Sequence, residues 1–354
     1  MINRIIFDCE RMKYDNTGLY HYCLNLGNHI TKFVLPGSEE LTFYSPYGTQ
    51  ELFCENSNHI VQTELHKFRL PQLKKFSVWH ATYQDSYYLP FWNKKIKVVL
   101  TIHDLNYMYD DSKPEWKKRR YLRRLQMLIN RADIIICVSD YGKNDVHFYC
   151  DVHNKPVHVI HNGTNSLKEP LLYNSSYKPI KPFIFSLGTV THKKNFHSLL
   201  PLIQPHSNME LVIAGRIDDT DYYNFILDTA EKMGIKGNIH IVGQVSETEK
   251  SWYFNNCHAF AFPSNAEGFG LPVTEAMSVG KPIFLSQRTA LPEIGGDAAF
   301  YFKNFSETHM NEIFVAGMKQ YKLFNMKDEI IKKGKAYCWD NAAREYWKVY
   351  RSLY

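Results

Sequence analysis

Short runs of apolar and β-branched residues alternate with longer amphipathic stretches through the first half of the chain. The runs lie at residues 4–8, 41–44, 78–81, 97–102, 134–138 and 157–160. Strands separated by helix-length segments are typical of a parallel sheet that is covered by helices. We therefore predict a doubly wound, Rossmann-like α/β domain over residues 1–170.

The same alternation begins again after a polar segment that carries three prolines around an Asn-Ser-Ser triplet. We predict a linker at residues 171–182 and a second Rossmann-like domain at residues 183–338. The closing residues 342–354 have apolar side chains at helical spacing, which predicts a last helix. The apolar runs of the second series lie at residues 183–187, 210–214, 238–242, 259–263 and 282–285.

Composition narrows the function classes. At 354 residues the chain is long enough for two domains. Its net charge of +6 suits a phosphorylated ligand or an anionic surface, and no groove-reading motif indicates nucleic acid. Seven scattered cysteines, an odd number, fit a reducing cytoplasm. No apolar run approaches the roughly 18 residues of a membrane span, so we expect a cytoplasmic protein with neither a cleaved signal nor a membrane helix.

The stretch from residue 263 to residue 277 joins two carboxylates to a glycine-rich turn and a helix start. Pro272 suits the first position of that helix, whose backbone N–H groups favour a phosphate. Two acids beside a phosphate would repel it unless they accept hydrogen bonds from hydroxyl groups, as a sugar supplies. Glu275 is then placed to take both ribose hydroxyls, and Glu267 to hold a hexose. The plainer alternative is a capped helix with two surface acids.

This stretch and its continuation closely resemble the signature of the retaining family-4 glycosyltransferases. The matching residues are 267–272, 275–277, 280–282, 291–294 and 296–299. The resemblance implies the GT-B fold, in which two Rossmann-like domains face a central cleft and a C-terminal helix, here residues 339–354, crosses back to the first domain. It also implies a hexose contact from Glu267, a ribose contact from Glu275, and donor contacts from the turn that holds Gly268, Phe269, Gly270 and Leu271.

His103 and Asp104 directly follow a predicted strand, and ligands of open α/β sheets bind at the carboxyl ends of strands. The alternative is that Asp104 caps the next helix and that His103 is packed or solvated. Residues 101–105 resemble a family segment beside the donor sugar. That resemblance implies that His103 orients a sugar hydroxyl or a phosphate, and that Asp104 orients the acceptor.

A basic loop follows the strand at residues 183–187. A lysine at such a position can neutralise the charge of a departing diphosphate. This position and the family resemblance make Lys194 our candidate for the pyrophosphate contact. The alternative is that the loop is simply solvated. The commonest family pattern has an arginine at the position of Thr189, which is itself one of the expected donor contacts. We therefore expect Lys193 or Arg216 to supply the second cation.

Three further segments are weaker candidates. Residues 16–19 resemble the glycine loop that contacts the diphosphate from the acceptor side, with Gly18 as the contact, although an ordinary turn has the same pattern. Backbone contacts near Val245 are expected to bind the base. Asp219 and Asp221 form an acid pair of the kind that binds a metal, but no histidine or further ligand is near in sequence. We expect neither a metal nor another cofactor, in line with the resemblance.

The segment 113–124 predicts a helix with an apolar stripe and a cationic opposite side. Such a helix suits docking to an anionic membrane or to a polyprenyl-diphosphate-linked acceptor, and a solvated face is the alternative. Peripheral association with the inner face of the cell membrane follows from the first interpretation. The basic residues are Lys113, Lys117, Lys118, Arg119, Arg120, Arg123 and Arg124.

These patterns together predict a metal-independent, retaining hexosyltransferase. The resemblance implies transfer of a hexose, with mannose preferred, from a nucleotide-diphosphate sugar to a saccharide or lipid-linked saccharide. We expect this step in the biosynthesis of a bacterial surface polysaccharide such as an O-antigen or capsule. Two alternatives remain at this point: a sugar phosphorylase of the same fold, and a catalytically silent partner subunit that binds a nucleotide sugar.

Overall fold

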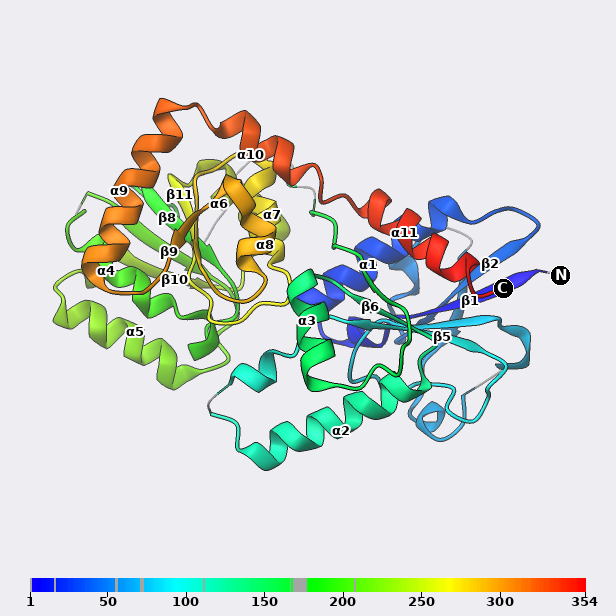
Figure 1. Cartoon of the computed structure of the whole chain (residues 1–354). Coiled ribbons are helices and arrows are strands. Elements are labelled where there is room, and N and C mark those ends of the chain that lie inside the picture. The colour runs from blue at the N-terminus through cyan, green and yellow to red at the C-terminus, as the bar shows by residue number, and fades with distance from the viewer. Residues whose placement is uncertain are drawn as a thin grey trace. The chain divides into compact units, whose positions relative to one another are not determined.

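The computed structural model describes residues 2–15, 17–54, 57–70, 73–110, 112–165, 167, 177–206 and 208–354. The chain divides into two compact units. The first unit combines Met1–Gly163 with Tyr337–Tyr354, and the second is Thr164–Ala336 (Figure 1). Of the expected linker, residues 171–176 lie outside the described residues.

A seven-stranded sheet with the order β3-β2-β1-β4-β5-β6-β7 forms the centre of the first unit. Every neighbouring pair of its strands is parallel. Buried parallel strands are apolar on both faces, which is why they appear in the sequence as continuous runs. The strands are β1 (Asn3–Asp8), β2 (Glu39–Ser45), β3 (Asn58–Val61), β4 (Val78–Ala81), β5 (Lys97–Ile102), β6 (Ile134–Cys137) and β7 (Val157–Val159).

The helices of the first unit include the end of the chain. The long helices are α1 (Gly18–Ile30), α2 (Glu115–Arg131), α3 (Asp140–Tyr149) and α11 (Trp339–Arg351). The short 3-10 helices are η1 (Glu10–Lys13), η2 (Thr31–Phe33), η3 (Gln50–Leu52), η4 (Glu64–Lys67), η5 (Leu73–Lys75) and η6 (Asn106–Tyr109). Figure 1 shows the red α11 beside the blue α1.

Buried hydroxyl groups attach α11 to the first unit. Tyr346 Oη lies 2.7 Å from Tyr22 Oη on α1, and Tyr350 Oη lies 2.7 Å from His80 Nδ1 on β4. Trp347 Nε1 donates to the Ile30 carbonyl oxygen at 2.7 Å. Because these groups are buried, their hydrogen bonds are costly to leave unmade. The last helix is therefore part of the core of the first unit.

A six-stranded, all-parallel sheet with the order β10-β9-β8-β11-β12-β13 forms the centre of the second unit. The prediction of two doubly wound α/β domains is therefore confirmed. The strands are β8 (Phe183–Leu187), β9 (Glu210–Ala214), β10 (Ile239–Gly243), β11 (Ala259–Phe262), β12 (Ile283–Ser286) and β13 (Phe300–Phe302).

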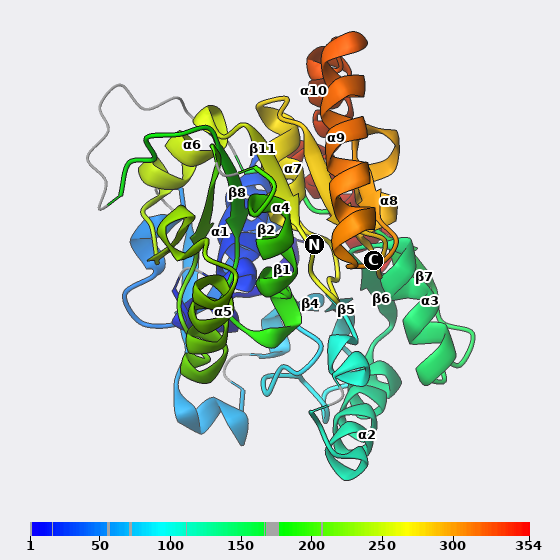
Figure 2. The same cartoon turned by 90° about the vertical axis from the view of Figure 1, so that its left-hand side faces the viewer.

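Helices cover both faces of the second sheet. One face packs on α4, α5 and α9, whose buried residues include Leu202, Ile226 and Phe314. On the other face, Phe185 of β8 contacts the ring of Phe254 on α6. Figure 2 shows the orange α9 and α10, which follow one another in the chain. The helices are α4 (Leu200–Ile203), α5 (Thr220–Lys232), α6 (Glu247–Asn256), α7 (Leu271–Ser278), α8 (Leu291–Gly295), α9 (Glu307–Leu323) and α10 (Lys327–Gly334), with η7 (His192–Lys194), η8 (Phe196–Leu199), η9 (Lys236–Asn238) and η10 (Gly296–Ala298).

Candidate functional site

Glycines line the carboxyl edge of the second sheet. Gly188, Gly215 and Gly243 follow or end β8, β9 and β10 and have φ values of 153°, 147° and 72°. Gly188 N donates to the Ala214 carbonyl at 2.9 Å, and Gly215 N donates to the Gly243 carbonyl at 2.7 Å. A Cβ atom at residue 215 would lie 2.0 Å from the carbonyl oxygen of residue 188. These turns thus pack backbone on backbone, which leaves peptide groups rather than side chains at the edge.

Lys194 and Glu267 form an ion pair beside these turns. Lys194 ends η7, and Asn195 adopts a left-handed conformation with φ 57° and donates from its side chain to the Pro263 carbonyl. This contact joins the lysine loop to the turn that carries the acid. Lys194 Nζ lies 2.6 Å from Glu267 Oε1, and Ser264 Oγ donates to the same oxygen at 2.5 Å. The structure therefore brings together two of the predicted site residues.

The charge of Glu267 is stabilised by its surroundings. Burial acts to raise the pKa of Glu267, but the charges of Lys194 and Lys193 and the hydrogen bonds from Lys194 and Ser264 outweigh it and lower the pKa. Glu267 is thus ionised at neutral pH and accepts hydrogen bonds only. It can hold hydroxyl groups of a ligand but cannot act as a proton donor.

Helix α7 begins directly after the glycine turn. Gly270 is its N-cap, with φ 100°, and the helix starts at Leu271. Pro272 therefore occupies the second helical position, not the first as predicted; its missing N–H is tolerated there for the same reason. The positive end of the α7 dipole lies at this turn and favours an anionic group.

Glu275 lies one turn into α7 and is buried. Its Oε1 accepts hydrogen bonds from Asn165 Nδ2 at 2.8 Å and from Lys250 Nζ at 2.9 Å. The alternative of a surface acid is therefore wrong for Glu275. Oε1 already has two donors, and the expected contact of Glu275 with both ribose hydroxyls stays a prediction.

Family models match both parts of the chain. The model described as "Glycosyltransferase Family 4" matches residues 53–166, and the model described as "Glycosyl transferases group 1" matches residues 175–336. The chain is a glycosyltransferase of the family-4 type. An O-antigen chain mannosyltransferase B of Escherichia coli is 25% identical over 341 residues, which cover 83% of this chain and 85% of that relative.

Solved structures share the GT-B fold of this glycosyltransferase. A sucrose-phosphate synthase from Thermosynechococcus elongatus superposes with a TM-score of 0.78 at 15% identity, over 100% of this chain and 99% of that one. Anabaena HepE in complex with UDP-glucose superposes with a TM-score of 0.73 at 13% identity, over 99% of both chains. Such low identity shows the fold alone.

The remaining donor-side candidates of the glycosyltransferase lie at the same edge but are more exposed. Arg216 is exposed and binds Asp218 through two hydrogen bonds of 2.5 and 2.8 Å. Lys193 is exposed as well, while its carbonyl oxygen accepts from Asn265 N at 2.8 Å. Thr189 follows the Gly188 turn, and Val245 precedes the capping box that starts α6. Either cation remains a candidate for the second phosphate contact.

Asp219 has a local structural role in the second unit. It is the N-cap of α5, and its side chain accepts from Tyr222 N at 2.9 Å. Its neighbour Asp218 is engaged by Arg216. These acids therefore cap a helix and balance a surface cation.

His103 and Asp104 follow β5 in the first unit. His103 is buried, its Nε2 lies 2.8 Å from the Thr82 carbonyl oxygen, and Tyr22 packs edge-on against its ring. Burial lowers the pKa of His103 to about 4, so the ring is neutral at pH 7. Since the carbonyl requires Nε2 to be the donor, Nδ1 is left as an acceptor. Asp104 Oδ1 accepts from Asn106 N, the first residue of η6, at 2.9 Å. The N-cap of η6 is Leu105, so Asp104 lies one residue before the cap that the alternative assigned to it.

Gly18 is the first residue of α1 in the first unit. The preceding Thr17 caps the helix by accepting from Tyr20 N at 3.2 Å, and Asn16 lies outside the described residues. A Cβ atom at residue 18 would have no heavy atom within 4 Å. Local crowding therefore does not require a glycine here, and the predicted diphosphate contact stays a prediction.

A buried acidic pair ends β1, and sequence reasoning missed it. Ser86 Oγ lies 3.1 Å from Asp8 Oδ2 and 3.2 Å from Glu10 Oε2. Burial first, and the charge of Glu10 second, raise the pKa of Asp8 well above its usual range. The position directly after a strand was a usable signal, but the partner Ser86 is remote in sequence. The pair ties the end of β1 to the loop after β4.

The basic run does not form one cationic helix face, which corrects the prediction. Lys113 precedes α2 and pairs with Asp110 at 2.8 Å. Lys118 is buried and lies 3.5 Å from Glu115, and Arg124 pairs with Asp85. Part of the basic run packs against the rest of the first unit, because tertiary contacts and not charge alone decide which side of a helix is buried. Four exposed cations remain on it, at Lys117, Arg119, Arg120 and Arg123.

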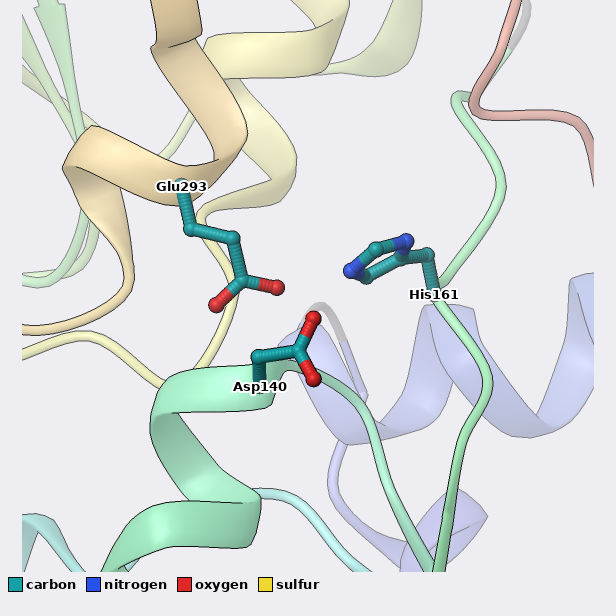
Figure 3. Close-up of side chains that lie close together, drawn as sticks. All are labelled: Asp140, His161 and Glu293. Carbon is teal, nitrogen blue, oxygen red and sulfur yellow. The ribbon is translucent and has the colours of Figure 1, made fainter.

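Figure 3 labels three side chains, of which Asp140 and His161 belong to the first unit. Asp140 begins α3, and one of its carboxylate oxygens lies within 4.8 Å of a ring nitrogen of His161, which follows β7. Glu293 is part of α8 in the second unit. Two side chains are fewer than the three or four protein ligands of a zinc site. The pair therefore does not by itself define a metal centre.

Among the described residues, no helix has both the length and the apolar character needed to cross a bilayer.

Proposed function

We propose that this glycosyltransferase moves a hexose, with retention, from a nucleotide-diphosphate sugar to a hydroxyl of a saccharide or lipid-linked saccharide. The observation that carries the proposal is the pairing of each motif acid with its own lysine. Glu267 is paired with Lys194 and Glu275 with Lys250, at the carboxyl edge of one sheet. Acids neutralised in this way can accept sugar hydroxyls without repelling the diphosphate between them.

In the proposed reaction the bond from the hexose anomeric carbon to the phosphate oxygen breaks, and a bond to the acceptor oxygen forms on the same face. Lys194 and the start of α7 stabilise the negative charge that develops on the departing diphosphate. Glu267 holds hydroxyls of the hexose so that the anomeric carbon is positioned. The acceptor proton passes to an oxygen of that diphosphate. The cationic side chains and the helix start supply the charge neutralisation, so we propose that no metal is required.

The neutral state of His103 favours one of its two predicted roles. Its Nδ1 offers a lone pair, and an acceptor nitrogen suits a sugar hydroxyl and repels a phosphate oxygen. We therefore assign His103 to a hydroxyl of the sugar. Asp104 keeps its predicted role toward the acceptor through Oδ2, since Oδ1 is used by Asn106.

The comparisons favour a particular substrate class. The similarity to an O-antigen mannosyltransferase supports mannose as the hexose and a surface polysaccharide as the product. We propose GDP as the carrier of the mannose. The UDP-glucose complex of HepE supports nucleotide-sugar binding by this fold. UDP is therefore tested alongside GDP as the nucleotide of the donor.

Thermal unfolding with nucleotides tests the donor site. The protein is unfolded in the presence of GDP, UDP, dTDP or ADP. A nucleotide that binds the folded protein and is present at about a hundred times its dissociation constant should stabilise that protein by roughly 2.7 kcal/mol. We expect a rise in melting temperature with one base, GDP first, and loss of that rise in Glu275→Ala. Lys236→Met, which removes an exposed lysine of the same unit, is the matched control and should keep the rise. No rise with any nucleotide would count against a nucleotide-sugar site and favour the phosphorylase.

The outward face of α2 supports an anionic membrane as a further partner. Trp116, Arg120, Arg123 and Met127 follow one another at spacings of four, three and four residues, so they form one stripe. Trp116 is 61% exposed and Met127 57% exposed. Within the described residues, no carboxylate pairs with the cations of this stripe. Helix α2 lies at the margin of its unit in both views (Figures 1 and 2). An apolar and cationic stripe of this kind suits the headgroup region of an anionic bilayer.

Co-sedimentation with vesicles tests this partner. The wild-type protein should bind vesicles that contain phosphatidylglycerol, and this binding should weaken as the salt concentration rises. Each surface cation contributes roughly 1 kcal/mol of electrostatic attraction to the anionic headgroups, and salt screens this attraction. Lys117→Glu combined with Arg120→Glu should abolish most of the binding. Lys319→Glu combined with Lys322→Glu makes the same charge change on exposed α9 positions and should leave it unchanged. Equal binding by both double variants would argue for nonspecific attraction.

A further inference from the structure

Lys250 joins a buried acid to an exposed one. Its Nζ lies 2.9 Å from Glu275 Oε1 and 2.7 Å from Glu247 Oε2. The side chain of Lys250 is 8% exposed, whereas that of Glu247 is 60% exposed and that of Glu275 only 3%. Burial acts to lower the pKa of Lys250, but the two carboxylates outweigh it and raise the pKa. The ammonium group is therefore charged and held on the inner side of α6.

The hydrogen bonds of Glu275 are unequally shared between its two oxygens. Asn165 Nδ2 and Lys250 Nζ both donate to Oε1. Oε2 accepts no hydrogen bond from any residue that the structure describes. Buried carboxylate oxygens in folded proteins normally have donors. Oε2 is not one of the fully enclosed polar atoms that lack a partner, so it is reachable from outside the protein and can take a donor that belongs to a ligand.

Stability alone does not explain this ion pair. Removing lysine and glutamate from water costs several kcal/mol, and an apolar pair of similar size is often at least as stable. A pair kept for packing would also be expected to use both carboxylate oxygens. The arrangement instead gives Oε1 of Glu275 two donors and leaves Oε2 with none among the described residues.

We infer that Lys250 and Asn165 are positioning residues that hold Oε1 of Glu275 and present Oε2 as the acceptor for the ribose hydroxyls of the donor nucleotide. The inference rests on the proposed function, since it needs a nucleotide at Glu275. The preference for ribose then depends on Lys250, which itself does not touch the sugar.

Binding of GDP and UDP, each compared with its 2′,3′-dideoxy analogue, tests the inference by calorimetry. A hydrogen bond to a charged group makes the wild-type protein prefer the ribonucleotide about tenfold to a hundredfold. Glu275→Gln and Lys250→Met should both reduce this preference to within about threefold, and Lys250→Arg should restore most of it. Lys236→Met is the matched control and should keep the wild-type preference. Asn165→Leu provides a second variant if Lys250→Met does not fold.

The outcomes separate the inference from the proposed function. A Lys250→Met protein with the wild-type ribose preference would overturn the inference. So would an equal loss of affinity for both analogues, because that result indicates direct contact with the base or phosphate, or a loss of structure. A wild-type protein that binds nucleotides without preferring ribose also overturns the inference and leaves the proposed function standing. Absence of nucleotide binding by the wild type overturns both.

Discussion

Replacing Lys194 by methionine should lower the turnover number about 10²- to 10³-fold, the usual effect of removing one group that stabilises a developing anion. Methionine keeps the length and apolar stem of the side chain but removes the charge. The stem still packs against Phe262, over whose ring Nζ now lies at 4.8 Å. Initial rates at saturating donor measure the effect, with Lys236→Met as the control that should keep wild-type turnover.

The same variant should also be less stable, by about 3–5 kcal/mol, because it leaves the largely buried carboxylate of Glu267 without its cation. Adding Glu267→Gln removes that unpaired charge and should recover part of the loss, while turnover stays low. Urea unfolding of the two single variants and the double variant measures the coupling. A double variant no more stable than Lys194→Met alone would mean that the ion pair is not what stabilises this turn.

Substituting alanine for Gly215 should reduce the free energy of unfolding by about 3 kcal/mol. The added Cβ would overlap the carbonyl oxygen of residue 188, a backbone atom that cannot rotate away, and φ 147° is strained for any residue with a side chain. The shifted Gly188 turn should also weaken nucleotide binding. Gly237→Ala is the matched control.

A Cβ atom at residue 237 meets no heavy atom within 4 Å, and its φ is not positive. That substitution should therefore be neutral or stabilise by a few tenths of a kcal/mol. Both variants are compared by urea unfolding. Equal stability of the two alanine variants would contradict the close packing of the turns after β8 and β9.

Local pattern was sufficient to predict most of both sheets. Central parallel strands such as β5 and β9 are buried on both faces, so their apolar runs are visible in the sequence. The strands that were missed are β3 and β13, which lie at the edges of their sheets. β3 is half exposed and carries Asn58 and His59, so it has neither an apolar run nor a regular alternation. Its place is decided by pairing with β2 rather than by its own residues.

The candidate site was only partly predictable for a related reason. Glu267 and Glu275 lie within one continuous motif, so their turn and helix could be predicted from residue types alone. Their partners could not: Lys250 is 25 residues away from Glu275 in the chain, and Asn165 is 110 away. A lysine on an amphipathic helix is most often solvated, and nothing in the residues around Lys250 indicates that it is buried against an acid. Such pairings are properties of the tertiary fold.

The membership of α11 in the first unit has a consequence for how the protein is made. The ribosome completes residues 1–163 long before it reaches Tyr346 and Tyr350, so α1 and β4 emerge without the hydroxyl groups that satisfy Tyr22 and His80. The second unit, by contrast, is continuous in sequence and can close as it is synthesised. We therefore expect the second unit to reach its native state first. The earlier-made unit should stay sensitive to proteases and chaperones until α11 has been synthesised.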